Sequence, residues 1–125
     1  MNVIHFDTNA LIALPIWVQQ DHPAIKRIQK GSTAAACALV WYEFVCGPVS
    51  AEHKMLAFAV LGGRIEPVRQ AGADKASELF NLAGRARRLR TDALIAGCAM
   101  SANAELLTLN RADFVVFERL GLKLL

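Results

Sequence analysis

The sequence predicts an α/β domain built around a mainly parallel β-sheet. Short apolar runs that suit buried strands alternate along the 125 residues with longer stretches of helical periodicity. Strands that alternate with helices usually form a parallel sheet with helices on both faces. A chain of this length can bury one good hydrophobic core, so we expect a single domain over residues 1–125.

The first expected strand is Val3–Phe6, a short apolar run with β-branched residues. The polar residues 7–9 follow it and are of the types that cap helices. We therefore expect a short helix over residues 9–14 that ends at Pro15, because proline interrupts the helical hydrogen-bond pattern.

The second helix should begin at residue 21 or 22 and end before Gly31, because glycine commonly follows a helix C-terminus. Residues 33–38 fit a buried parallel strand, although alanine is a poor strand former. The next helix, residues 41–45, is broken by Gly-Pro at residues 47–48.

In the second half, Ser50 should start a helix that ends at Gly62 and Gly63. A short strand over residues 64–68 and a long amphipathic helix over residues 72–88 follow. The remaining elements are a helix capped by Thr91 that runs to about residue 103, a strand at 106–109, a turn of helix at 111–114 and an edge strand at 122–125.

Composition limits the kinds of protein this chain can be. It is 54% hydrophobic, but its longest unbroken apolar run, residues 34–42, is too short to cross a bilayer, and no secretion signal is visible. Cys37, Cys46 and Cys98 are widely spaced among hydrophobic residues, which argues against zinc and for buried thiols. We expect a cytoplasmic protein without membrane attachment, whose surplus apolar surface faces a protein partner.

Positive charge is concentrated in one short segment. The net charge is only +3, yet Arg85, Arg87, Arg88 and Arg90 lie immediately before Asp92. These arginines suit the solvated C-terminal end of a helix, where cations are favourable. As a cluster they also suit contacts with the phosphates of a nucleic acid, and both interpretations stay open.

Four carboxylates lie at the edges of apolar segments: Asp7, Glu43, Asp92 and Asp113. Asp7 and Asp113 follow strands, so they fall at the carboxyl edge of a parallel sheet, where ligands bind in such folds. Asp92 begins a helix, and Glu43 lies in a helix that can reach back to the same edge. Carboxylates beside a core are costly to ionise unless a cation compensates them, so the pattern predicts a divalent metal site.

Each of these residues has a simpler interpretation when it is taken alone. Asp7 and Thr8 suit a helix cap, and Asp92 equally suits the positive end of a helix dipole. Glu43 suits a helix surface, and Asp113 suits an ordinary turn. Only the joint pattern favours a metal site.

Histidine and aromatic side chains are expected to be structural. His5 lies in an apolar strand and should be buried, whereas His22 and His53 should face solvent on helices. Trp17 and Trp41 could stack on bases, but packing in the core or in an interface is the favoured interpretation.

Several segments together resemble the signature of PIN-domain nucleases, and within them the small VapC-type toxins of VapBC toxin–antitoxin pairs. The matching segments are Asp7-Thr8-Asn9, Glu43 with Gly47, Arg87 with residues 92–96, and residues 108–114. The resemblance runs from residue 3 to the C-terminus, and all four acids match in order. Residues 92–96 and 108–114 are the most specific parts, while the residues before Glu43 depart from the family pattern.

The resemblance implies a three-layer α/β/α PIN-like domain that hydrolyses RNA with the help of Mg²⁺ or Mn²⁺. It implies that the four acids, Asp7, Glu43, Asp92 and Asp113, are the catalytic residues and metal ligands. Supporting polar residues that orient the carboxylates or contact phosphate are Thr8, Asn9, Thr108 and Asn110. It also implies a toxin that inhibits translation and growth, a cognate VapB-type antitoxin that covers the acidic groove, and a homodimer.

Other functions fit the sequence less well. A haloacid-dehalogenase-like phosphatase needs a second acid two residues after the first, where this chain has Asn9. A receiver domain needs paired acids after its first strand and a late lysine, and neither is apparent. A catalytically silent PIN scaffold that binds RNA or a partner stays open, as does a stand-alone nuclease without an antitoxin.

Overall fold

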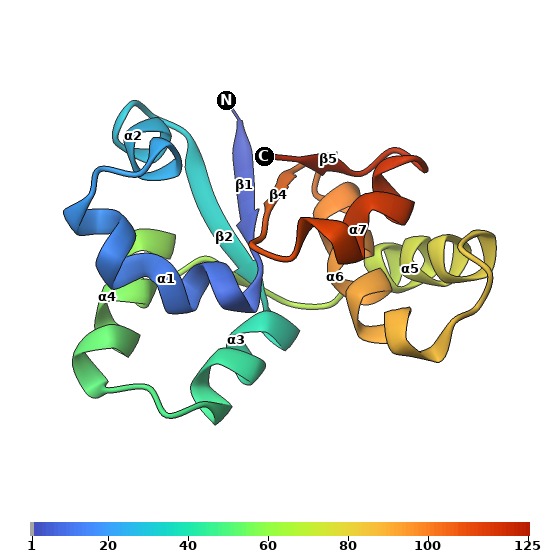
Figure 1. Cartoon of the computed structure of the whole chain (residues 1–125), viewed down its shortest axis with the longest axis horizontal. Coiled ribbons are helices and arrows are strands. Elements are labelled where there is room, and N and C mark those ends of the chain that lie inside the picture. Colours follow the sequence, from blue (N-terminus) through green and yellow to red (C-terminus); the bar gives the residue numbers. More distant parts are fainter. Residues whose placement is uncertain (1) are drawn as a thin grey trace.

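The computed structural model describes residues 2–125, and its centre is a five-stranded sheet in which every pairing is parallel (Figure 1). The strands are β1 (Val3–Phe6), β2 (Thr33–Cys37), β3 (Ile65–Glu66), β4 (Glu105–Leu107) and β5 (Lys123–Leu124). Their order across the sheet is β3-β2-β1-β4-β5, so β1 is central. The predicted α/β class and parallel sheet are confirmed.

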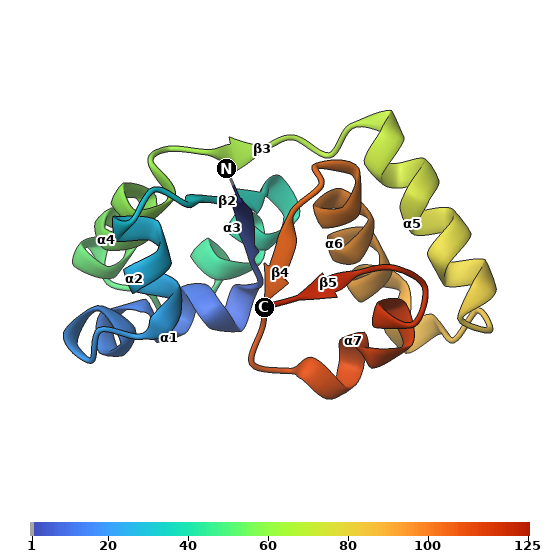
Figure 2. The ribbon, with the colours of Figure 1, turned by 90° about the horizontal axis from the view of Figure 1, so that it is seen from above.

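Helices cover both faces of this sheet and form a three-layer arrangement (Figure 2). The helices are α1 (Thr8–Gln19), α2 (Pro23–Gln29), α3 (Ala38–Cys46), α4 (Ala51–Leu61), α5 (Gln70–Leu82), the 3₁₀ helix η1 (Arg87–Leu89), α6 (Arg90–Ser101) and α7 (Arg111–Glu118). The helices α1, α2 and α4 lie on one side of the sheet, and α5, α6 and α7 lie on the other. None of the helices in the described part of the chain has the length and apolar character needed to span a membrane.

The core explains why the alanine-rich segment is a strand. Ala34, Ala35 and Ala36 are almost completely buried, with helices packed on both faces of β2. The small side chains allow this close approach, so tertiary packing outweighs the weak strand propensity of alanine. On the other side of the sheet, Gly97 of α6 touches α5, since a Cβ atom there would lie 2.6 Å from the Gly72 carbonyl oxygen.

The prediction that the first helix ends at Pro15 is wrong, because α1 continues through Pro15 to Gln19. A proline inside a helix leaves the carbonyl oxygen four residues earlier without its usual N–H donor. Here that oxygen belongs to Leu11, and it accepts a hydrogen bond of 2.9 Å from Nε2 of His53 on α4. His53 therefore joins two helices and does not simply face solvent as predicted.

Other boundaries also differ from prediction. The helix expected over residues 72–88 ends at Leu82, because Gly84 (φ +94°) and Arg85 (φ +63°) turn the chain in the left-handed region. Thr91 lies inside α6 and is not its cap, which is Leu89. The single turn of helix expected at residues 111–114 continues as α7 to Glu118.

Two further side chains lie in unexpected places. His22 is half-buried: it caps α2 through a hydrogen bond from the Ala24 N–H to its Nδ1 (3.1 Å) and stacks on Trp17. Of the three cysteines, Cys37 and Cys98 are buried as predicted, whereas Cys46 is exposed at the end of α3. His5 is buried in β1, as predicted.

Candidate active site

Asp7, the residue after β1, makes hydrogen bonds through its main-chain N–H and through both carboxylate oxygens. Its main-chain N–H donates to the Leu107 carbonyl oxygen of β4 (2.9 Å). Its Oδ1 accepts from the Thr8 N–H and its Oδ2 accepts from the Thr108 hydroxyl, both at 2.8 Å. Because the side chain is only 6% exposed and caps α1, its direction is fixed by the fold.

Glu43 is brought to Asp7 by Thr8, the first residue of α1. The Thr8 hydroxyl donates to Oε1 of Glu43 at 2.9 Å, while the Thr8 N–H binds Asp7. Glu43 reaches this position because α3 starts directly after β2, the strand beside β1. Thr8 thus orients two of the predicted carboxylates at once.

The loop after β4 is tied to the same edge of the sheet. Oδ1 of Asn9 accepts from the Leu109 N–H at 2.9 Å, so Asn9 organises this loop. The Asn110 N–H donates to the Thr108 hydroxyl at 3.0 Å, which directs the proton of that hydroxyl toward Asp7. The four supporting residues that the sequence singles out therefore all lie around Asp7 or the loop beside it.

Asp92 and Asp113 complete the group from the first turns of α6 and α7. Burial raises the pKa of Asp92 to about 6, with further increases from the charges of Asp7, Asp113 and Glu43. The positive charge of Arg88 opposes this shift in the Asp92 pKa. Since Asp92 responds to the three other acids, the fold brings all four carboxylates into one electrostatic site.

The pKa of Asp7 is also raised, chiefly because the carboxyl is buried. The hydrogen bonds from Thr108 and Thr8 act in the opposite direction and lower the Asp7 pKa, while the charge of Asp113 raises it. Two of the four acids are therefore held in surroundings that disfavour their ionised forms.

The four arginines do not form one patch directed at the acids. All are exposed in the connection from α5 to α6. The guanidinium carbons of Arg85 and Arg90 lie 5.9 Å and 5.8 Å from the ring centre of Phe80. Arg88 is near enough to Asp92 to lower its pKa, so it is the arginine that the fold brings to the acidic site.

A family comparison matches the model of the PIN domain to residues 4–120. The chain belongs to the PIN domain family. No curated protein sequence matches it.

Solved structures share this PIN fold. A toxin-antitoxin complex from Klebsiella pneumoniae is 24% identical over 89% of both chains, with a TM-score of 0.62. FitAcB from Neisseria gonorrhoeae is 17% identical over 97% of this chain and 95% of that chain, with a TM-score of 0.65. VapBC2 from Rickettsia felis, bound to a promoter DNA fragment, is 20% identical over 98% of this chain and 97% of that chain, with a TM-score of 0.61. The TM-scores establish a common fold with these proteins.

The acidic site of this PIN domain fits a divalent cation by the chemistry of its donors. The ion pairs among residues 2–125 join Arg27 to Glu105 and Lys75 to Glu78, so none of them neutralises the four acids. Within the same residues, no three Asp, Glu, His or Cys side chains are close enough to enclose an ion by themselves. Mg²⁺ commonly keeps several waters and takes further ligands from substrate phosphates, so an incomplete set of carboxylates suits it.

Proposed function

We propose that this PIN domain is a divalent-metal-dependent endoribonuclease and the toxin of a type II toxin–antitoxin pair that inhibits translation and growth. The observation that carries the proposal is the gathering of acids at one sheet edge, where Thr8 binds both Asp7 and Glu43. The pKa of Asp92 is raised first by burial and then by the charges of the three other acids, which agrees with this grouping. Among residues 2–125 no ion pair neutralises these acids, and such a concentration of negative charge is suited to binding Mg²⁺ or Mn²⁺.

In the proposed mechanism, Asp7, Asp92 and Asp113 would hold the metal together with water and the substrate phosphate, and Glu43 would bind it directly or through water. A bound ion would lower the pKa of its water and offset charge on the attacked phosphate. Thr108 and Thr8 keep the Asp7 and Glu43 carboxylates in fixed orientations. A carboxylate oxygen that is not engaged by metal would accept a proton from the attacking water. The products would carry a 5′-phosphate and a 3′-hydroxyl.

The arginines between α5 and α6 would bind the RNA backbone. Of these arginines, Arg88 is the one whose positive charge lowers the pKa of Asp92, so it would bind the phosphate nearest to the acids. Arg85, Arg87 and Arg90 are exposed nearby in sequence and are available to phosphates farther along the strand.

Exposed apolar side chains support a protein partner for this domain, which we propose to be a VapB-type antitoxin in the cytoplasm. Large hydrophobic side chains are exposed on three of the four helices that follow β1 and β2, namely Ile12 and Ile16 of α1, Tyr42 of α3, and Met55 and Phe58 of α4. Apolar surface of this kind is typical of interfaces. A second copy of the chain, forming a homodimer, would cover further surface.

Cleavage of a single-stranded RNA with Mg²⁺, with Mn²⁺ and with a chelator tests the nuclease. Asp7→Asn should reduce the rate by at least about 100-fold, because even residues that only support metal ligands contribute 10–100-fold. Asparagine also caps helices, so α1 should stay intact. Asp74→Asn, at an exposed position on α5, is the matched control. Cleavage that needs no metal, or that survives Asp7→Asn, would show the proposal to be wrong.

Co-expression with the product of the adjacent upstream reading frame tests the toxin role separately. We expect that product to bind this chain and to relieve the growth arrest that the chain causes alone. If it neither binds nor relieves arrest while purified protein still cuts RNA, the chain is a stand-alone nuclease.

A further inference from the structure

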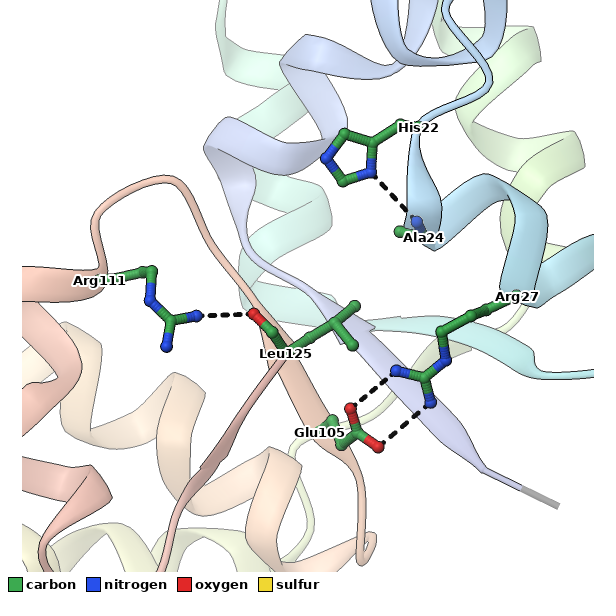
Figure 3. Close-up of polar contacts among 6 residues, drawn as sticks. All are labelled: His22, Ala24, Arg27, Glu105, Arg111 and Leu125. Atoms are coloured by element: carbon green, nitrogen blue, oxygen red, sulfur yellow. Dashed lines mark hydrogen bonds and ion pairs between the residues drawn. The ribbon is translucent and has the colours of Figure 1, made fainter.

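A pocket of about 320 Å³ lies between α1, α2 and the residues that follow β4, and it includes Thr108, the residue that binds Asp7. Its walls include Trp17, His22, Arg27, Thr108, Leu109 and Leu125. Figure 3 shows His22, Arg27 and Leu125 arranged around this space. None of the four acids lines it, so the pocket is distinct from the acidic site.

One wall of the pocket is aromatic. The rings of Trp17 and His22 stack with their centres 4.1 Å apart and their planes at 19°. The Ala24 N–H donates to Nδ1 of His22, so the neutral imidazole carries its proton on Nε2, where it is a hydrogen-bond donor (Figure 3). Burial lowers the pKa of His22, which favours this neutral form.

Two wall residues of the pocket are fixed by arginine hydrogen bonds. Arg27 makes a bidentate pair with Glu105, with N–O distances of 2.9 Å and 3.1 Å. Leu125 is fixed from outside the pocket, because Nη1 of Arg111 donates to its main-chain oxygen at 2.6 Å (Figure 3). The pocket therefore combines the planar rings of Trp17 and His22 with the planar guanidinium of Arg27.

Thr108 connects the pocket to the acidic site. The side chain lines the pocket, and its hydroxyl donates to Oδ2 of Asp7 at 2.8 Å. Thr108 therefore contacts both the pocket and the acidic site.

We propose that this pocket receives one base of the RNA next to the cleaved phosphate and sets the sequence preference of cleavage. The inference rests on the proposed nuclease function. Single-stranded bases stack on aromatic rings and guanidinium planes, as this wall allows. The N–H at Nε2 of His22 can donate to an acceptor on the edge of the base, such as O6 or N7 of guanine. An apolar side chain of a protein partner would leave this donor unused.

Tryptophan fluorescence tests base binding without any need for catalysis. In Trp41→Phe, Trp17 is the only remaining tryptophan, since the chain has two. The four nucleoside 5′-monophosphates should quench it saturably, guanosine most strongly. His22→Asn in this background should weaken binding roughly tenfold, because it removes the ring but retains a residue that caps α2. His22→Phe keeps a ring and should bind better than His22→Asn, while Val68→Asn, remote from the pocket, should leave binding unchanged.

Mapping of cleaved ends in an RNA that contains every dinucleotide step completes the test. We expect His22→Asn to reduce cleavage beside the preferred base roughly tenfold more than cleavage elsewhere. No quenching by nucleotides, or an unchanged preference in His22→Asn, would overturn the base pocket. A variant impaired only in antitoxin binding would also overturn it, because the pocket would then belong to a protein partner. Quenching by nucleotides in a protein that cuts no RNA would instead support the pocket and contradict the nuclease proposal.

Discussion

Asp92 is the acid of the site whose pKa is raised to about 6, which shows that its ionised form is disfavoured there. Its pKa of about 6 in the folded protein exceeds the ordinary value of 3.8, first through burial and then through its acidic neighbours. The folded protein therefore holds this proton more tightly than the unfolded chain does. The resulting stabilisation is complete below the ordinary pKa and is lost as the pH rises through the folded-state pKa.

We expect Asp92→Asn to stabilise the metal-free protein in a pH-dependent way. With a chelator present, the variant and the unaltered protein should melt at similar temperatures near pH ~4, whereas the variant should melt higher at pH ~7.5. Thermal unfolding followed by circular dichroism across this range measures the difference. Asp74→Asn is the control and should give no gain that grows with pH. An equal change in melting temperature at every pH would contradict the electrostatic explanation.

At this scale the sequence singled out four acids as candidates but did not show how the fold holds them. Asp7 and Asp113 were recognisable because they follow strands, and residue order matched the family pattern. The bond from Thr8 to Glu43 joins residues far apart in the chain, so no local pattern reveals it. His22 and His53 were expected to face solvent because their partners, Trp17 and the Leu11 carbonyl, are supplied only by the folded chain.

Among the elements, α1 depends on a neighbour to tolerate its proline. The Leu11 carbonyl oxygen would be unpaired within α1, and α4 supplies His53 as the donor. A buried or half-buried carbonyl without a donor is costly, so this contact stabilises the helix and attaches α4 to it. The position of α1 matters for function, because α1 begins at Asp7 and carries Thr8.

A double-mutant cycle should reveal this dependence. His53→Ala should lower the free energy of unfolding by about 1–3 kcal/mol, because the Leu11 carbonyl loses its donor. In a Pro15→Ala background the new main-chain N–H can bind Leu11, so the same His53 change should cost less, with a coupling of about 1 kcal/mol. Urea unfolding of the four proteins gives these values. Additive effects would show that His53 acts only through its packing against Phe44.

Element boundaries were predictable where a residue type carries the signal and not elsewhere. Ser50 and Gly62 bound α4 as expected, with Ser50 as the N-cap and Gly62 in the left-handed region at the C-cap. The end of α5 was not predictable because Arg85, a residue type that rarely adopts a positive φ, shares the left-handed turn with Gly84. The start of α6 was misplaced because η1 leads directly into it, so no capping side chain marks the boundary.

At the scale of the whole molecule, the sheet topology explains why the acids meet. The chain proceeds from β1 to β2 and β3 on one side, then returns to β4 and β5 on the other (Figure 2). The order therefore reverses beside β1, and in open parallel sheets such a switch point forms the ligand crevice at the carboxyl ends of the strands. Asp7 follows β1 at this point, while Asp113 follows β4. Strand order is a property of tertiary packing, so the sequence could permit this convergence but not establish it.

Under the proposed function the molecule would also bind a polyanion beside its own acidic site, although its net charge is only +3. We expect the arginines between α5 and α6 to supply much of the attraction, because they are the densest positive segment of the chain. Replacing Arg87 and Arg88 by glutamine should weaken RNA binding and make it less sensitive to salt. For every phosphate that the variant no longer neutralises, the slope of log affinity against log salt should fall by roughly 0.7.

Fluorescence anisotropy with a labelled single-stranded RNA and the Asp7→Asn protein measures this slope without cleavage. Replacing Lys26 and Lys30 by glutamine, on and just after α2, removes the same charge from another part of the surface and is the matched control. If net charge alone governed binding, both pairs would change the slope equally. A larger change for Arg87 and Arg88 would instead indicate that the RNA crosses the start of α6, close to Asp92.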